Sequence, residues 1–211
     1  MREILAVLEK DLRSEFRVKY ALNTLLMFSI VTVVVVSFTV GVFSLSQKVS
    51  SALLWVILFF ASTSGLPRTF VKEEERKTIK ALKLSLDGEK VLIGKMLFNL
   101  SLMLSLEIII VPLFVVLLNF KVQSLISFLL ILFFGTCGLV TITTMISAII
   151  SKTKSKGELL AVLSFPLLLP LLLPCIQSTY TQQLTDLKFI LSFSVVMFVS
   201  SLMLFDYIWK E

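Results

Sequence analysis

Six long apolar runs, separated by shorter polar stretches, dominate the sequence. They cover residues 21–45, 51–66, 95–118, 124–150, 159–177 and 187–208. A helix that crosses a bilayer needs at least about 17 predominantly apolar residues, and five of the runs meet that length. The second run meets it only if its polar flanks join the helix. The pattern predicts an all-α integral membrane protein with six transmembrane helices, folded as a single transmembrane domain over residues 1–211.

The segment before the first run has the period of an amphipathic helix. Ile4, Leu8, Leu12 and Phe16 recur every four residues, and charged side chains lie between them. A helix of low overall hydrophobicity with one apolar face lies in the plane of the membrane interface. We therefore predict an interfacial helix over residues 1–20; a helix that packs on a soluble partner is the alternative.

Lysine and arginine are distributed unevenly among the connections. Of the 20 in the chain, three lie in alternate connections, at Lys48, Lys121 and Lys188, and the other 17 lie in residues 1–19, 67–95 and 151–157 and in the C-terminal tail. Because basic residues are retained on the cytoplasmic side, both termini are predicted to be cytoplasmic. The same asymmetry argues against a re-entrant second run. Trp55 is expected to mark the outer membrane boundary.

Composition and motifs narrow the class of protein. Hydrophobic residues make up 57% of the chain and charged residues 16%, against roughly 45–50% and 25% in soluble domains. A soluble enzyme and a nucleic-acid-binding module are therefore excluded. The chain has no histidine, which removes the usual general base and haem ligand.

A phosphate-binding loop is absent from the sequence. Between Gly88 and Gly94 there are five residues where that loop has four, and Met96 follows Lys95 where it has Ser or Thr. The chain itself is therefore not expected to hydrolyse ATP. We interpret Lys95 as an anchor at the cytoplasmic membrane boundary.

Residues 67–94 form the one sizeable polar segment between the runs. Acidic residues come first and basic residues follow, an order that complements a helix dipole. Ile79, Leu82 and Leu86 give an apolar edge, so we predict a short amphipathic helix and then a turn at Asp87. A connection this long is uncommon unless it is functional. We interpret it as a cytoplasmic docking element for a soluble partner; a solvated loop is the alternative.

One acid lies in the middle of an apolar run. Placing Glu107 at that depth costs about 2.5–3.5 kcal/mol, so its side chain should face the bundle interior, a partner or a water-filled cavity. A proton or substrate contact and a hydrogen-bonded packing role are equal alternatives. Pro112, five residues later, predicts a kink in the same helix.

The fifth run carries three prolines at intervals of four residues, Pro166, Pro170 and Pro174. Each proline removes a backbone donor, and the freed carbonyls must find partners inside protein. The run is therefore predicted to be bent or locally unwound. As a set the prolines favour a mobile gate or a broken helix beside a transport path, although each alone is typical of a static kink.

Three stretches resemble the haem exporter B family (CcmB), the type 2 ABC exporter permeases of cytochrome c maturation. They are Phe70 followed by Glu73 and Glu74, Thr78-Ile79-x-x-Leu82-x-Leu84-Ser85 leading to Gly94-Lys95, and Pro166-x-x-x-Pro170-Leu171-Leu172. The resemblance covers the whole chain. It departs at Lys77, where the family usually has glycine, and at Leu86, where it usually has proline.

The resemblance implies one half of a homodimeric membrane domain in a bacterial or organellar inner membrane. Two copies of a separate ATPase, CcmA, would bind ATP and Mg²⁺ and dock on the cytoplasmic segment, and CcmC-like and CcmD-like subunits would join the complex. The ATP-driven step would serve haem export or release of a haem-loaded chaperone. Because this chain lacks histidine, haem would be held by a partner. The residues expected to couple to the ATPase are Phe70, Glu73, Glu74, Glu75, Thr78, Ile79 and Leu82.

Three other functions stay open at this level. A type 2 permease for a lipid, drug or polysaccharide would share these features. A passive membrane assembly scaffold would bind partners without an ATP-dependent change. An intramembrane enzyme is disfavoured, because Glu107 is the only deep ionisable residue.

Overall fold

The computed structural model describes residues 2–18, 20–40, 45–75, 77–153 and 156–210. Regular structure in these ranges is helical throughout: α1 (Arg2–Val18), α2 (Tyr20–Val40), α3 (Gln47–Gly65), α4 (Arg68–Glu75), α5 (Ile79–Ser85), α6 (Gly88–Leu117), α7 (Leu125–Ser151), α8 (Lys156–Thr181) and α9 (Leu187–Lys210). Parts of three predicted segments lie outside the described residues: 1 and 19 of the interfacial helix, 41–44 of the first span, and 76 of the polar connection.

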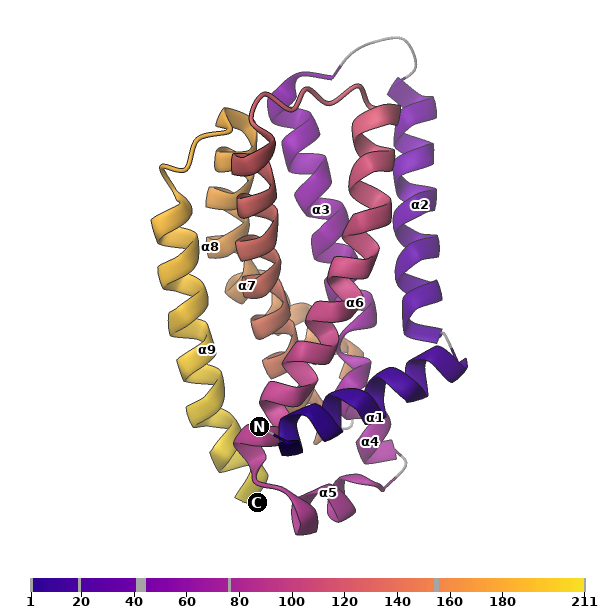
Figure 1. Cartoon of the computed structure of the whole chain (residues 1–211), viewed down its shortest axis with the longest axis vertical. Coiled ribbons are helices and arrows are strands. Elements are labelled where there is room, and N and C mark those ends of the chain that lie inside the picture. The colour runs from indigo at the N-terminus through magenta and orange to yellow at the C-terminus, as the bar shows by residue number, and fades with distance from the viewer. Residues whose placement is uncertain (1, 19, 41–44, 76, 154–155, 211) are drawn as a thin grey trace.

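Six long helices form the body of the molecule (Figure 1). These helices, α2, α3, α6, α7, α8 and α9, are long and apolar enough to cross a membrane. The prediction of an all-α integral membrane protein with six spans is confirmed. Helix α3 begins at Gln47, four residues before the predicted start, because the Ser46 hydroxyl accepts a hydrogen bond from the Val49 amide and caps the helix. The earlier start gives the second run a full span.

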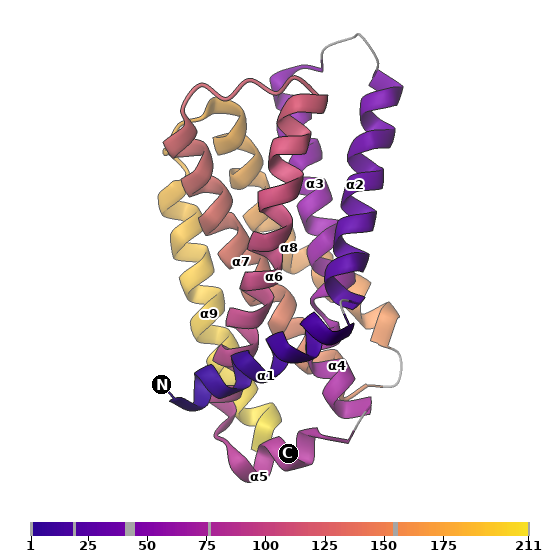
Figure 2. The ribbon, with the colours of Figure 1, turned by 45° about the vertical axis from the view of Figure 1, so that its right-hand side comes forward.

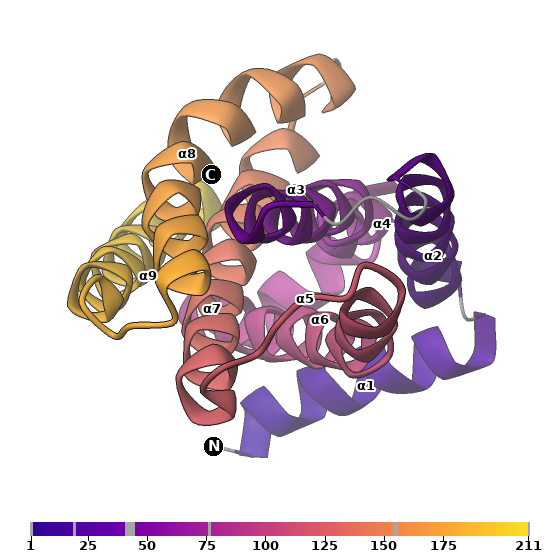
Figure 3. The ribbon, with the colours of Figure 1, turned by 90° about the horizontal axis from the view of Figure 1, so that it is seen from above.

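The spans alternate in direction, so the chain enters and leaves the bundle at the same end. Helices α1, α4 and α5, together with the end of α9, gather at that end, and the connections from α6 to α7 and from α8 to α9 lie at the other (Figures 1 and 2). Helix α1 lies across the end of the bundle, beside α6 (Figures 1 and 3). The end that α1 crosses carries the basic connections.

Helix α7 is the centre of the bundle and is buried along most of its length. Its Gly135 leaves room for an indole ring: a Cβ there would lie 2.2 Å from Cη2 of Trp55. Trp55 is fully buried, and its Nε1 donates a hydrogen bond to Oγ1 of Thr179, 2.8 Å away. The ring of Trp55 therefore packs inside the bundle, in the space that the glycine on α7 leaves, and does not face outward.

The helices that contain proline are continuous. Helix α6 passes through Pro112 to Leu117, and α8 passes through all three of its prolines. Local unwinding is therefore ruled out for residues 156–181, and the other predicted outcome, a bend, is visible when the bundle is seen from above (Figure 3). The prolines at 166 and 170 lie on the exposed side of α8.

Contact between α1 and α6 depends on a glycine. A Cβ at Gly94 would lie 2.8 Å from Cβ of Val7 and 3.2 Å from the carbonyl oxygen of Ile4. We expect Gly94→Ala to push α1 away and to cost about 1–3 kcal/mol of unfolding free energy. Thermal unfolding in detergent, followed by reaction of the buried Cys175 thiol with a fluorogenic maleimide, measures this.

Gly157 provides the matched control for this substitution, because no atom lies within 4 Å of a Cβ built there. Gly157→Ala should be neutral or stabilising by up to about 1 kcal/mol, the gain in helix propensity. Equal or higher stability of Gly94→Ala relative to Gly157→Ala would contradict the tight packing of α1 on α6.

Candidate coupling site

The polar connection folds as two short helices, α4 and α5, where the sequence predicted one. The amide of Lys77 donates to the carbonyl of Glu74, and the amide of Thr78 donates to the carbonyl of Glu73, both at 3.0 Å. Lys77 has φ 58°. This pattern of bonds around a left-handed residue is a Schellman motif, which ends a helix. We refer to residues 68–85 as the α4–α5 element.

Glycine should suit position 77 better than lysine. A residue with a side chain pays about 1–2 kcal/mol in the left-handed region, and glycine does not. We expect Lys77→Gly to raise the free energy of unfolding by about 1 kcal/mol, measured by the same thermal assay. Lys121→Gly, outside a helix at the other end of the bundle, is the comparison and should not stabilise; the Lys77 assignment fails if both variants shift alike.

The apolar residues of the α4–α5 element face the protein's own spans. Phe70 is 1% exposed, its ring lies 5.2 Å from that of Phe205, and its amide donates to the hydroxyl of Ser147 at 3.3 Å. Ile79 is also buried, and Leu82 lines a cleft beside α1. The apolar edge predicted from the sequence therefore attaches the element to the membrane domain.

The outward face of α5 carries a different leucine. Leu84 is 90% exposed, the largest exposure among the large apolar side chains of the described residues. Thr78 and Ser85 are exposed on the same short segment, and Glu75 is exposed at the end of α4. Sequence reasoning did not assign Leu84 to docking. The sequence did indicate a second face on this helix. Ile79, Leu82 and Leu86 share one helix face, and Leu84 lies on another.

A buried lysine joins three helices. Lys95 of α6 is 1% exposed, and its Nζ lies 3.1 Å from Oδ2 of Asp11 on α1 and 3.4 Å from Oε1 of Glu73 on α4. The same Nζ donates to the carbonyl of Thr69, also at 3.1 Å. The interpretation of Lys95 as a boundary anchor is therefore wrong: α1 folds over it and supplies a buried partner.

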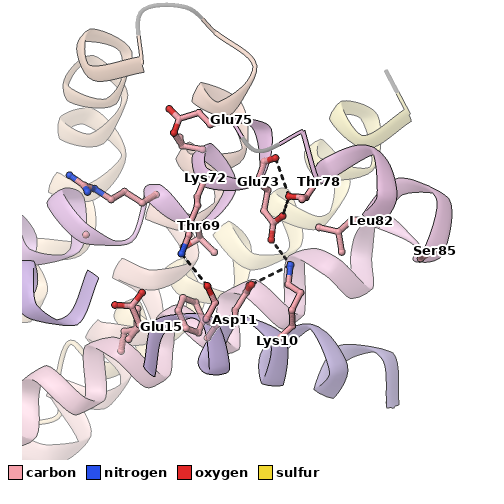
Figure 4. Close-up of a pocket in the computed structure, with 16 residues that line it drawn as sticks. Lys10, Asp11, Glu15, Thr69, Lys72, Glu73, Glu75, Thr78, Leu82 and Ser85 are labelled. Carbon is pink, nitrogen blue, oxygen red and sulfur yellow. Dashed lines mark hydrogen bonds and ion pairs between the residues drawn. The ribbon is translucent and has the colours of Figure 1, made fainter. Parts of the chain in front are cut away.

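A second lysine completes this group, which we call the ionic cluster: Lys10, Asp11, Glu73 and Lys95. Lys10 forms an ion pair with Glu73 and lies 3.4 Å from Oδ1 of Asp11 (Figure 4). Partial burial lowers the pKa of Lys10, but its bonds to Glu73 and Asp11 outweigh that effect and leave the pKa above its usual value. Two cations therefore face two anions across α1, α4 and α6.

Glu73 is committed to this cluster and is not a free docking group. Its second carboxylate oxygen accepts a hydrogen bond from the hydroxyl of Thr78, which closes the turn between α4 and α5 (Figure 4). Glu74 lies 3.8 Å from Nζ of Lys152 at the end of α7. The predicted coupling residues therefore act mostly as internal attachments.

A neutral network ties α4 to α6 and α7 as well. The Thr69 hydroxyl donates to Oδ1 of Asn99 at 2.7 Å, and Nδ2 of Asn99 donates to the hydroxyl of Thr144 at 2.8 Å. Asn99 and Thr144 are fully buried. Such a satisfied polar network fixes the relative positions of the helices that share it.

Glu107 and the prolines lie apart from this site. Glu107 is 7% exposed and accepts a hydrogen bond from the hydroxyl of Thr136 on α7. The acid therefore faces the bundle interior, one of the three predicted environments, and its described contact is a packing interaction between α6 and α7. Neither Glu107 nor the prolines of α6 and α8 are among the described residues that line the cleft beside α1.

The fold and this site together define a multi-pass membrane protein with one helical element attached to the end of its bundle. A family model described as CcmB protein matches residues 2–208, so the chain belongs to the CcmB family. This family provides the membrane permease subunit of the haem-exporting ABC transporter of cytochrome c biogenesis, in a complex with a separate ATPase. A search of curated proteins found no match.

Proposed function

We propose that this chain couples ATP hydrolysis by a CcmA-like subunit to haem export or to release of a haem-loaded chaperone. The observation that supports the proposal is the attachment of the α4–α5 element. The element continues directly from α3 and leads into α6. The ionic cluster joins it to α1, and the Asn99 network joins it to α7. A force on α5 would therefore be transmitted to α1, α3, α6 and α7.

In the proposed mechanism the ATPase subunits close on ATP and displace the α4–α5 element as a rigid body. Because α4 is held by buried polar contacts, α1, α3 and α6 follow it. The hydrogen bond from Trp55 to Thr179 joins α3 to the far end of α8. Movement of α3 would thereby reach the span that carries Pro166, Pro170 and Pro174, which we propose as the gate.

The end of the bundle that carries α1, α4 and α5 faces the cytoplasm in this proposal. In the sequence, 17 of the 20 basic residues fall in residues 1–19, 67–95 and 151–157 and in the C-terminal tail, and retention of basic residues sets the orientation of membrane proteins. The membrane would be a bacterial or organellar inner membrane. Two copies of the chain would associate with two ATPase subunits, which hold ATP and Mg²⁺, and with CcmC-like and CcmD-like subunits, one of which would hold haem.

Purification of the tagged chain from its own host in mild detergent tests the proposal. Mass spectrometry would identify the subunits, and an absorbance scan would detect haem. We expect an ATPase together with cytochrome-maturation subunits. An ATPase without those subunits would indicate an exporter of another substrate, such as a lipid, drug or polysaccharide. Absence of any ATPase would contradict the coupling role and favour a passive scaffold.

A further inference from the structure

A cleft of about 880 Å³ lies between α1 and the α4–α5 element (Figure 4). The coupling mechanism does not use it. Its volume falls within the range of about 300–1,000 Å³ that is typical of small-ligand sites. Its walls are Lys10, Asp11, Ser14 and Glu15 of α1, residues of α4 and α5, and Gly65, Phe98 and Leu102 of the spans.

The lining of the cleft is both polar and apolar. Gly65, the last residue of α3, and Phe98 and Leu102 in the first half of α6 contribute apolar surface. The charged residues of the lining come from α1 and α4. Leu5 and Phe16 of α1 are 57% and 69% exposed, which is expected of a helix that lies in a lipid surface. The cleft therefore lies at the depth where lipid head groups meet acyl chains.

The lining carries charges of both signs. Its cations are Lys10, Arg68 and Lys72, and its anions are Asp11, Glu15, Glu73 and Glu75. Lys10, Asp11 and Glu73 are paired within the ionic cluster, so recognition of a ligand would fall to the other charged groups of the lining. A head group with separated positive and negative charges complements both sets.

Lys72 is the anion-binding group best placed for this purpose. Figure 4 shows its side chain extending from α4 toward α1. Its Nζ donates to the hydroxyl of Ser14 at 3.2 Å and forms no ion pair with the part of the chain that the structure describes. An ammonium paired only with a neutral hydroxyl leaves donors for a phosphate oxygen.

The carboxylate of Glu15 is the corresponding group for a cation. One of its oxygens accepts the Leu22 amide at 3.1 Å at the start of α2, which fixes the carboxylate at the wall of the cleft. A primary ammonium can donate hydrogen bonds to a carboxylate, whereas a quaternary ammonium is recognised by clustered aromatic rings. Phe98 is the single aromatic residue in the described lining.

From these observations we propose that the cleft binds a zwitterionic phospholipid with a primary ammonium, such as phosphatidylethanolamine. The phosphate contacts Lys72 and Ser14, the ammonium contacts Glu15, and the acyl chains leave past Phe98 and Leu102. The bound lipid fills the space between α1 and α4. This proposal does not depend on the ATPase partner, so it stands or falls separately from the coupling role.

Native mass spectrometry of the full-length chain tests the site. The delipidated protein is incubated with equal amounts of phosphatidylethanolamine, phosphatidylcholine and phosphatidylglycerol. We expect one retained phosphatidylethanolamine, with about tenfold lower occupancy in Lys72→Gln, because a charge-assisted bond is lost. Glu15→Gln keeps an acceptor for the Leu22 amide and should remove the preference for the primary ammonium over choline.

Lys121→Gln is the matched control, because Lys121 is an exposed lysine in the connection at the other end of the bundle. It should retain lipid like the unmodified chain. Ser14→Ala, which removes only a hydroxyl, gives a second reading if Lys72→Gln does not fold. Preferred binding of phosphatidylglycerol, full retention in Lys72→Gln or Ser14→Ala, or the absence of a specific lipid would overturn the proposal. If no specific lipid binds, a peptide of a partner subunit becomes the alternative occupant of the cleft.

Discussion

We expect Lys95→Met to destabilise the protein by about 3–5 kcal/mol, the usual result of removing one partner from a buried ion pair. Methionine fills a similar volume but leaves Asp11 and Glu73 with a single cation, Lys10. The carbonyl of Thr69 also loses its donor. At roughly 2–4 °C per kcal/mol for a chain of this size, the midpoint should fall by about 6–20 °C in the Cys175 thiol assay.

Two further variants separate charge imbalance from loss of packing. Lys48→Met removes an exposed lysine at the start of α3, at the end of the bundle opposite to the ionic cluster. This variant should leave the midpoint of thermal unfolding unchanged. Adding Asp11→Asn to Lys95→Met restores the balance of charges in the ionic cluster, so the double variant should be more stable than Lys95→Met alone. A double variant that is less stable, or a Lys95→Met midpoint equal to that of the Lys48 control, would show that the cluster does not hold α1 in place.

The spans and their direction could be predicted because both depend on local sequence. Apolar run length gives each span, and the uneven distribution of lysine and arginine gives their alternation. The first amphipathic helix was likewise visible in the spacing of Ile4, Leu8 and Leu12. Within that stripe Leu8 and Leu12 pack against the core of the bundle, whereas Phe16 is 69% exposed, because helix spacing shows which residues share a face and not which neighbour covers it.

The environment of Lys95 could not be predicted in this way. A lysine at the start of an apolar run resembles a boundary anchor, and its burial depends on Asp11, which is 84 residues away in the sequence. The burial of Trp55 could not be predicted for the same reason, since the space for its ring comes from Gly135 on another helix. In both cases the missing information was the approach of a distant helix.

The docking face of α5 could be identified only once the structure showed which face packs against the membrane domain. Ile79 is buried and Leu82 contributes to the cleft wall, so the membrane domain occupies the apolar edge seen in the sequence. Leu84 is 90% exposed and lies on the face of α5 that the membrane domain leaves open. Leu84 is therefore the residue through which we expect the ATPase to engage α5.

Replacement of Leu84 by aspartate should weaken ATPase binding by about 30-fold or more, the effect of losing a central interface residue and burying a charge in its place. The midpoint of thermal unfolding should not change, because the side chain contributes little to the folded chain. The measurement combines the affinity of the purified chain for its ATPase with the rate of ATP hydrolysis by the complex.

Leu184→Asp is the matched control, since Leu184 is exposed in the connection at the other end of the bundle. Normal binding and normal ATPase stimulation by Leu84→Asp would move the docking surface away from α5, whereas equal losses in both leucine variants would show a general effect of the added charge.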